Sequence, residues 1–163
     1  MDGEGPALFE NVTFNGNHAA KWGGAISYHT VAIALLNCTV ARNVADEGSD
    51  GLFGADGNHP TVNNTLFYDN GTAGSNRHCN REITGAHNMA FPAAPDDSCG
   101  ASLQHADPLL ADDLADHGGF TFTLALGNAS PAIDAGSDCP STDQRGEPRD
   151  TDQCDLGAYE LQP

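Results

Sequence analysis

The sequence predicts an all-β fold, a right-handed parallel β-helix of about three to four coils with a loop-rich C-terminal cap. The first observation is an asparagine-bounded phrase that occurs three times, at steps of 26 and 27 residues. The second is that the apolar residues between the phrases show no helical period. Repeats of this length cannot bury a core alone, so each coil must stack on its neighbour. The phrase occupies residues 11–17, 37–43 and 64–70.

Each phrase predicts a strand followed by a turn, because β-branched and aromatic residues are bounded by Asn, Gly and Asp. In coils stacked about 4.8 Å apart, Phe14, Val40 and Phe67 would lie above one another in the core. The first and last asparagines of the phrases would form two ladders, because an amide side chain both donates and accepts. The ladders would consist of Asn11, Asn37 and Asn64, and of Asn17, Asn43 and Asn70.

The first phrase leads into Trp22-Gly23-Gly24-Ala25-Ile26, where the glycine pair permits a tight corner. The stretches 14–17 and 23–26 resemble the FxxN and GGAI phrases of the polymorphic outer-membrane-protein type of repeat. The second phrase has Val40 in place of phenylalanine, and neither later phrase is followed by GGAI. The resemblance implies a surface-exposed β-helix of the pectin-lyase-like fold.

The C-terminal third lacks the asparagine-bounded phrase and instead carries several short motifs in a fixed order. Together they resemble the choice-of-anchor Q domain of bacterial secreted and surface proteins. The resemblance implies a secreted β-helix, with coils over 1–106 and a segment over 107–163 that packs on the last coil as part of one domain. The motifs are Asp107-Pro108-Leu109-Leu110, Ser130-Pro131-Ala132-Ile133-Asp134 and Cys154-Asp155-Leu156-Gly157-Ala158-Tyr159-Glu160.

The five cysteines indicate an oxidising compartment. Cys79 and Cys99 bracket one loop, and Cys139 and Cys154 bracket another, so we predict two disulfides worth about 3 kcal/mol each. Cys38 lies inside a strand phrase and is predicted to be a buried free thiol.

Two arginines of the C-terminal segment lie in an acidic surrounding. A guanidinium group binds carboxylates at two points, so we predict an ion-pair cluster that pins the loops, with an Arg/Asp active site as the alternative. The residues are Arg145 and Arg149, with Asp134, Asp143, Asp150 and Asp155.

The formal net charge is −17, from 23 acidic and 6 basic residues. This charge excludes nucleic acid as a partner and argues against docking on an anionic membrane. No stretch is apolar enough for membrane insertion. The repeat register begins mid-coil near Pro6, so we expect a piece of a longer extracellular or cell-surface protein.

Candidate ligand contacts are few. Trp22, beside the only lysine, could stack on a sugar together with Tyr28. Asp46, Asp50 and Asp56 crowd a glycine-rich loop, where carboxylate oxygens could hold calcium; a solvated acidic loop is the alternative. No motif indicates catalytic residues, and no cofactor other than calcium is suggested.

The function predicted from these features is a non-enzymatic extracellular structural or adhesion module that assembles end to end through the edges of its coils. Its partners would be further copies of itself or an extracellular glycan. One alternative is a carbohydrate-binding or polysaccharide-cleaving β-helix, either lyase or hydrolase. The other is an inert spacer within a larger surface protein.

We expect salt or calcium to raise the melting temperature, because both weaken the repulsion among the excess carboxylates. The measurement is a thermal melt followed by circular dichroism at low salt, at molar salt and with millimolar calcium. Equal melting temperatures under all three conditions would contradict the expectation.

Overall fold

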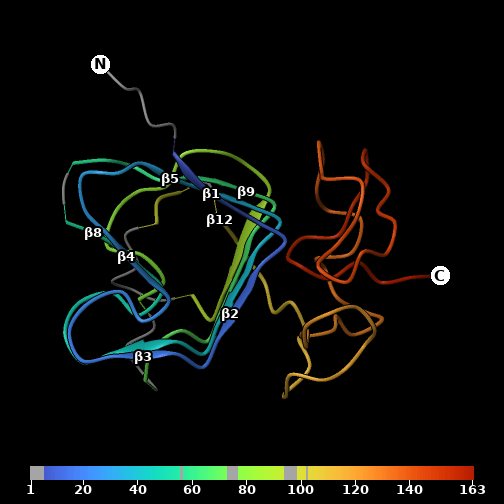
Figure 1. Ribbon diagram of the computed structural model, residues 1–163, viewed down its shortest axis with the longest axis horizontal. Coiled ribbons are helices and arrows are strands. Elements are labelled where there is room, and N and C mark those ends of the chain that lie inside the picture. Colours follow the sequence, from blue (N-terminus) through green and yellow to red (C-terminus); the bar gives the residue numbers. More distant parts are fainter. Residues whose placement is uncertain (1–5, 56, 73–76, 94–98, 102) are drawn as a thin grey trace.

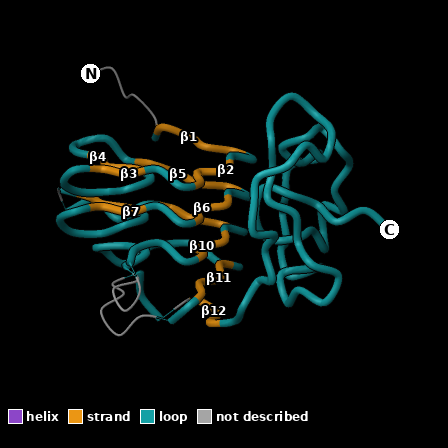
Figure 2. The backbone as a smooth tube through the Cα atoms, turned by 90° about the horizontal axis from the view of Figure 1, so that it is seen from below, coloured by secondary structure: helices purple, strands orange, loops and turns teal. Residues whose placement is uncertain are grey.

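The computed structural model describes residues 6–55, 57–72, 77–93, 99–101 and 103–163. These residues form twelve strands and no helix, and every strand pairing is parallel. The strands stack as a β-solenoid of about three turns (Figure 1, Figure 2), which confirms the predicted fold class.

The strands are short and separated by tight corners. In chain order they are β1 (Ala7–Glu10), β2 (Thr13–Asn15), β3 (His18–Ala19), β4 (Ile26–Tyr28), β5 (Ile33–Leu36), β6 (Thr39–Ala41), β7 (Val44–Ala45), β8 (Leu52–Gly54), β9 (Thr61–Asn63), β10 (Leu66–Tyr68), β11 (Asn88–Phe91) and β12 (Leu103–His105).

The strands of the described residues form four parallel sheets, one on each side of the coil. The longest has the order β12-β11-β10-β6-β2, and a second has the order β1-β5-β9. Two narrower sheets pair β3 with β7 and β4 with β8. In every sheet the strand from the first coil lies at an edge.

The register confirms the predicted stack of core side chains. Phe14 pairs with Val40, and Val40 pairs with Phe67. Val40 and Phe67 are fully buried, whereas Phe14, in the first coil, is only partly buried. The three phrases are therefore successive turns of one coil.

The first asparagine of each phrase makes the corner that separates two strands. Asn11, Asn37 and Asn64 have φ angles of 54°, 48° and 51°. Asparagine tolerates this left-handed conformation better than most residues. The corner separates the strand that precedes each phrase from the strand within it, so a single period-2 pattern does not run through both.

The last asparagines form a ladder inside the coil, as predicted. Asn43 Oδ1 accepts from the backbone N–H of Asn17 at 3.0 Å, and Asn70 Oδ1 accepts from that of Asn43 at 3.1 Å. Asn43 Nδ2 also donates to Phe14 O at 2.9 Å. Each amide thus satisfies backbone groups that the corner leaves without a strand partner.

Residues 107–163 pack along the side of the stack, not on the last coil alone (Figure 2). A second core, outside the coil, lies between the longest sheet and this segment, hereafter the cap. The sheet contributes Ala41, Leu66 and Met89, and the cap contributes Leu110, Leu124, Leu126, Ala132 and Leu156.

We expect Asn43→Ala to lower the free energy of unfolding by about 2–4 kcal/mol, because it removes a fully buried amide and its part-buried hydrogen bonds to Asn17 N and Phe14 O. Urea denaturation measures the change. Asn128→Ala, at an exposed turn, is the control and should change stability by less than about 0.5 kcal/mol. Equal midpoints for the two variants would contradict a structural role for the ladder.

Candidate functional site

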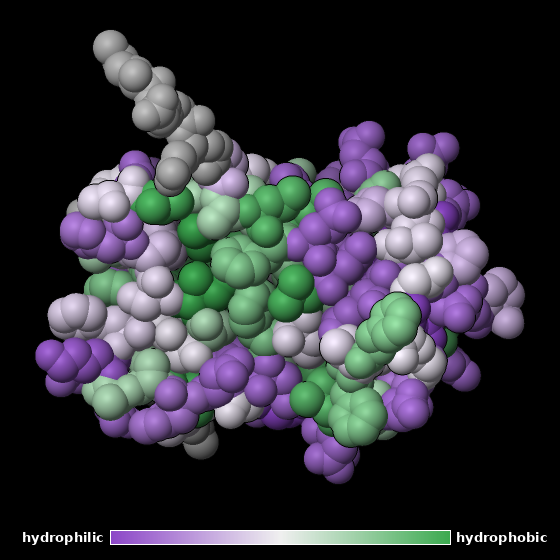
Figure 3. All heavy atoms as spheres, viewed as in Figure 1, coloured by the Kyte–Doolittle hydropathy of each residue, from purple (hydrophilic) through white to green (hydrophobic). Residues whose placement is uncertain are grey.

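Among the described residues, no strand pairs with the outer edge of the first coil, hereafter the open end of the solenoid. Figure 3, which views the stack from this end, shows apolar side chains gathered over the first coil. Among them are residues that are only partly buried although they pack against the core: Phe9, Val12, Phe14, Ala25 and Ile26. Leu8, beside them on β1, is 59% exposed.

Comparison with the next coil shows that these are core positions on which no described coil lies. Leu35 pairs with Phe9 in the register and is 1% exposed. Leu52 pairs with Ile26 and is also 1% exposed. The same position of the coil is therefore buried in the second coil and only partly buried in the first.

The inner ladder ends at the same place. Each Oδ1 in the ladder accepts the backbone N–H of the equivalent asparagine one coil earlier. Within the described part of the chain, no group donates to Asn17 Oδ1. The open end thus combines unpaired strand edges, partly exposed core and a free ladder acceptor, a combination suited to strand addition.

The outer asparagine corner, in contrast, faces the cap. Asn11 Nδ2 donates to Thr142 O at 2.8 Å, and Asn37 Nδ2 donates to Asp155 O at 3.1 Å. Asn64 Nδ2 donates both to Ser137 O at 2.8 Å and to Asn37 Oδ1 at 3.2 Å. The predicted outer ladder is thus mainly a line of attachment for the cap.

The predicted ion-pair cluster occupies the interior of the cap. Arg145 Nη2 lies 2.7 Å from Asp143 Oδ2, and Arg149 Nη1 lies 2.7 Å from Glu160 Oε2. Arg149 Nη2 also donates to Asn11 Oδ1 at 3.1 Å, which ties the cluster to the first coil.

Burial sets the protonation behaviour of this cluster. It raises the pKa of Glu160 and of Asp155 above their ordinary values, because desolvation outweighs the hydrogen bonds and Arg149. Burial also lowers the pKa of Arg149. Such a cluster orders loops, and its carboxylates are already occupied by Arg149 and by the backbone N–H groups of Asp155 and Leu161.

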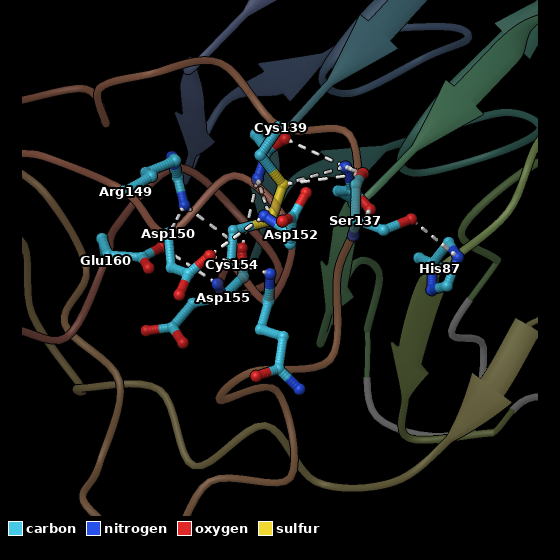
Figure 4. The surroundings of a disulfide bond; sticks show 12 residues. His87, Ser137, Cys139, Arg149, Asp150, Asp152, Cys154, Asp155 and Glu160 are labelled. Atoms are coloured by element: carbon cyan, nitrogen blue, oxygen red, sulfur yellow. Dashed lines mark hydrogen bonds and ion pairs between the residues drawn. A yellow bond between two sulfur atoms is a disulfide. The ribbon is translucent and has the colours of Figure 1, made fainter.

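A groove of about 250 Å³ lies where the cap meets the third and fourth corners. His87 occupies the fourth corner, with φ 55°, at the position equivalent to Asn64. Ser137 Oγ lies 3.2 Å from His87 Nε2, and Figure 4 shows the two side chains pointing toward each other. This Ser–His contact, between segments 50 residues apart, has no signal in the sequence.

The two residues predicted to contact a sugar, Trp22 and Tyr28, differ in exposure. Trp22 is 44% exposed and stacks on Phe53, with ring centroids 5.1 Å apart. Tyr28 is 7% exposed, and its hydroxyl donates to Asn58 O at 3.3 Å. The Tyr28 ring thus belongs to the core, and a carbohydrate contact at Trp22 and Tyr28 stays a prediction.

The acidic loop does not form a metal cage in the described residues. Asp46 Oδ1 lies 2.8 Å from His18 Nε2, and Asp50 is buried with Oδ1 accepting from Ala45 N at 2.9 Å. Asp56 lies outside the described residues. No group of three or more potential metal ligands occurs where the chain is described. Asp50 stabilises its own loop through the hydrogen bond from Ala45 N. Calcium binding stays a prediction.

The cysteines are arranged as predicted. Cys79 is bonded to Cys99 in the last coils, and Cys139 is bonded to Cys154 in the cap (Figure 4). Cys38 is a buried free thiol, and burial raises its pKa to about 11. It is therefore a core residue and no candidate nucleophile.

The family model of the Chlamydia polymorphic membrane protein repeat matches residues 11–28. This stretch contains both phrases on which the sequence resemblance rests, but it is a small part of the 163 residues. The chain matches none of the curated proteins and none of the solved structures compared with it. No helix among the described residues could cross a membrane. The fold and the match together support a repeat-rich, surface-type β-helix.

We expect Arg149→Met to lower the free energy of unfolding by about 3–5 kcal/mol at neutral pH, because Glu160 is left as an unpaired buried carboxylate. The pKa of Glu160 then rises further above its ordinary value of 4.5. A raised pKa means that the folded state takes up the proton first, so the variant regains stability as the pH falls toward 4.5.

Urea denaturation at neutral and mildly acidic pH measures this effect. Arg149→Met/Glu160→Leu should be more stable at neutral pH than Arg149→Met alone. Arg81→Met serves as the control, because it removes a partly buried arginine whose hydrogen bonds, among the described residues, go to the backbone carbonyls of Gly54 and Ala55. A pH-independent loss in Arg149→Met would contradict the prediction.

Proposed function

We propose that this chain is an extracellular, surface-exposed structural module of the adhesin type, and that it associates with a second copy through its first coil. The observation that carries the proposal is the open end, where core positions such as Phe9 and Ile26 are only partly buried. Monomeric proteins seldom leave both a sheet edge and an apolar core surface uncovered.

A second copy supplies the chemistry that this end lacks. Another first coil would bring four strand edges and a matching apolar surface. Apolar residues near the far end of the stack are covered, since Ile83, Cys99 and Leu103 are only 3%, 0% and 7% exposed. This asymmetry favours pairing of two first coils into a closed dimer over the head-to-tail filament that equal ends would give.

The net charge of −17 acts against this association. Two copies repel each other across the interface, and the repulsion is screened within about 10 Å at 0.1 M salt. Association is therefore expected to strengthen with ionic strength, unlike a contact held by opposite charges.

The extracellular location is supported by the two disulfides and by the match to a membrane protein repeat. The choice-of-anchor Q resemblance of residues 107–163 stays a prediction. If the module proves to be a spacer in a longer chain, the same open end would receive an upstream coil of that chain.

We expect the purified protein to form dimers at molar salt, and Leu8→Lys to remain monomeric under the same conditions. The lysine places a charge on the β1 edge, a known means of blocking edge pairing. Sedimentation velocity at low and at molar salt measures the oligomer, and electron microscopy distinguishes dimers from filaments.

Leu114→Lys is the matched control, because it changes the same residue type at an exposed position in the cap, 37% exposed. It should associate like the unmodified protein. Monomers at all salt concentrations, or equal association of the two variants, would contradict the proposal.

A further inference from the structure

We infer that Ser137 and His87 form a nucleophile–base pair that hydrolyses short-chain esters in the groove between coil and cap. The inference is independent of the proposed self-association, because the groove lies beside the third and fourth corners and not at the open end. Three features support this pair: the tautomer of His87, the hydrogen bonds that hold the backbone of Ser137, and the residues that line the groove.

The hydrogen bonds of His87 fix which ring nitrogen carries the proton. Nδ1 lies 3.1 Å from Ala135 O, and a carbonyl oxygen can only accept, so Nδ1 is the protonated nitrogen. Nε2 therefore presents its lone pair to Ser137 Oγ, 3.2 Å away. The serine hydroxyl donates to the imidazole, which is the arrangement that a general base requires.

Both members are held by structure that does not depend on their own contact. The left-handed corner orients His87, and Asn64 holds the backbone of Ser137 from both sides. Ser137 N donates to Asn64 Oδ1 at 3.3 Å, and Asn64 Nδ2 donates to Ser137 O at 2.8 Å. The Cys139–Cys154 disulfide ties the chain two residues beyond Ser137 (Figure 4). The pair is thus positioned before any ligand arrives.

The groove offers a donor for the charge that develops on an attacked carbonyl. Asn63 lines the groove, and its Oδ1 accepts from Ala86 N at 3.0 Å. This bond fixes the amide orientation, and Asn63 Nδ2 has no hydrogen-bond acceptor among the described residues. A free amide N–H in this place can stabilise an oxyanion.

The remaining lining sets the substrate class. Leu36 and Ala86 provide a small apolar wall, and about 250 Å³ accommodates a short acyl group. Asp138, also in the lining, carries a carboxyl group that disfavours anionic esters. The groove therefore suits a short acyl ester of a neutral or cationic alcohol.

The reaction proceeds in two balanced steps. Ser137 Oγ bonds to the acyl carbon while His87 Nε2 takes the hydroxyl proton, and the alcohol leaves with that proton. Water then attacks the acyl-serine with His87 again as base, which releases the carboxylic acid and restores the hydroxyl. No oxidant, reductant or metal is consumed.

The test combines labelling with kinetics. An alkyl fluorophosphonate should phosphonylate Ser137 with loss of fluoride, as located by peptide mass spectrometry. Hydrolysis of p-nitrophenyl acetate should fall to the buffer rate in Ser137→Ala and by about 10²-fold or more in His87→Asn. Asparagine suits the fourth corner, because it already occupies the three equivalent corners, so His87→Asn should fold.

Ser141→Ala and His105→Asn are the matched controls, at exposed positions outside the groove. Both should keep the hydrolysis rate and the labelling of the unmodified protein. Circular dichroism and melting temperature confirm that all variants are folded. Absence of a label on Ser137, or hydrolysis that persists in Ser137→Ala, would overturn the inference.

Discussion

The structure depends on the left-handed asparagine corner that ends one strand and begins the next in each coil. Asn11, Asn37 and Asn64 all turn the chain here with φ near 50°. The backbone N–H of each corner asparagine donates to a carbonyl of the next coil, so the coil stays paired through the turn. The side chains at this corner point outward and satisfy backbone carbonyls of the cap. One residue type thus both bends the coil and attaches the cap.

The first and the last asparagine of the phrase therefore have different structural roles, although both positions carry the same residue type. The inner ladder, with Asn43 at its centre, bonds to the coil itself and is buried. The first asparagine, at the outer corner, bonds mainly to the cap. Asn37, for example, bonds to Asp155, which lies 118 residues further along the chain. Since both arrangements use the same amide chemistry, only tertiary packing separates them.

The period of the phrase was sufficient to predict the coil, its core stack and its inner ladder, because stacking repeats a local pattern. The side-on position of the cap and the pairing of Arg149 with Glu160 were not predictable, because they join segments with no shared pattern. The Ser137–His87 contact has the same origin. The burial of the Tyr28 ring was not predictable for a different reason: the sequence pattern around an aromatic residue does not show whether its ring faces the core or the solvent.

The lateral cap also decides where a function can reside. It covers the longest sheet from the first coil, through Asn11, to the fourth corner at His87. That face is consequently unavailable as the long lateral groove that a polysaccharide chain would need. The two sites proposed here, the apolar surface of the first coil and the small groove at the seam, lie outside that covered face. The cap occupies one side of the stack and, within the described residues, does not extend over the apolar side chains of the first coil.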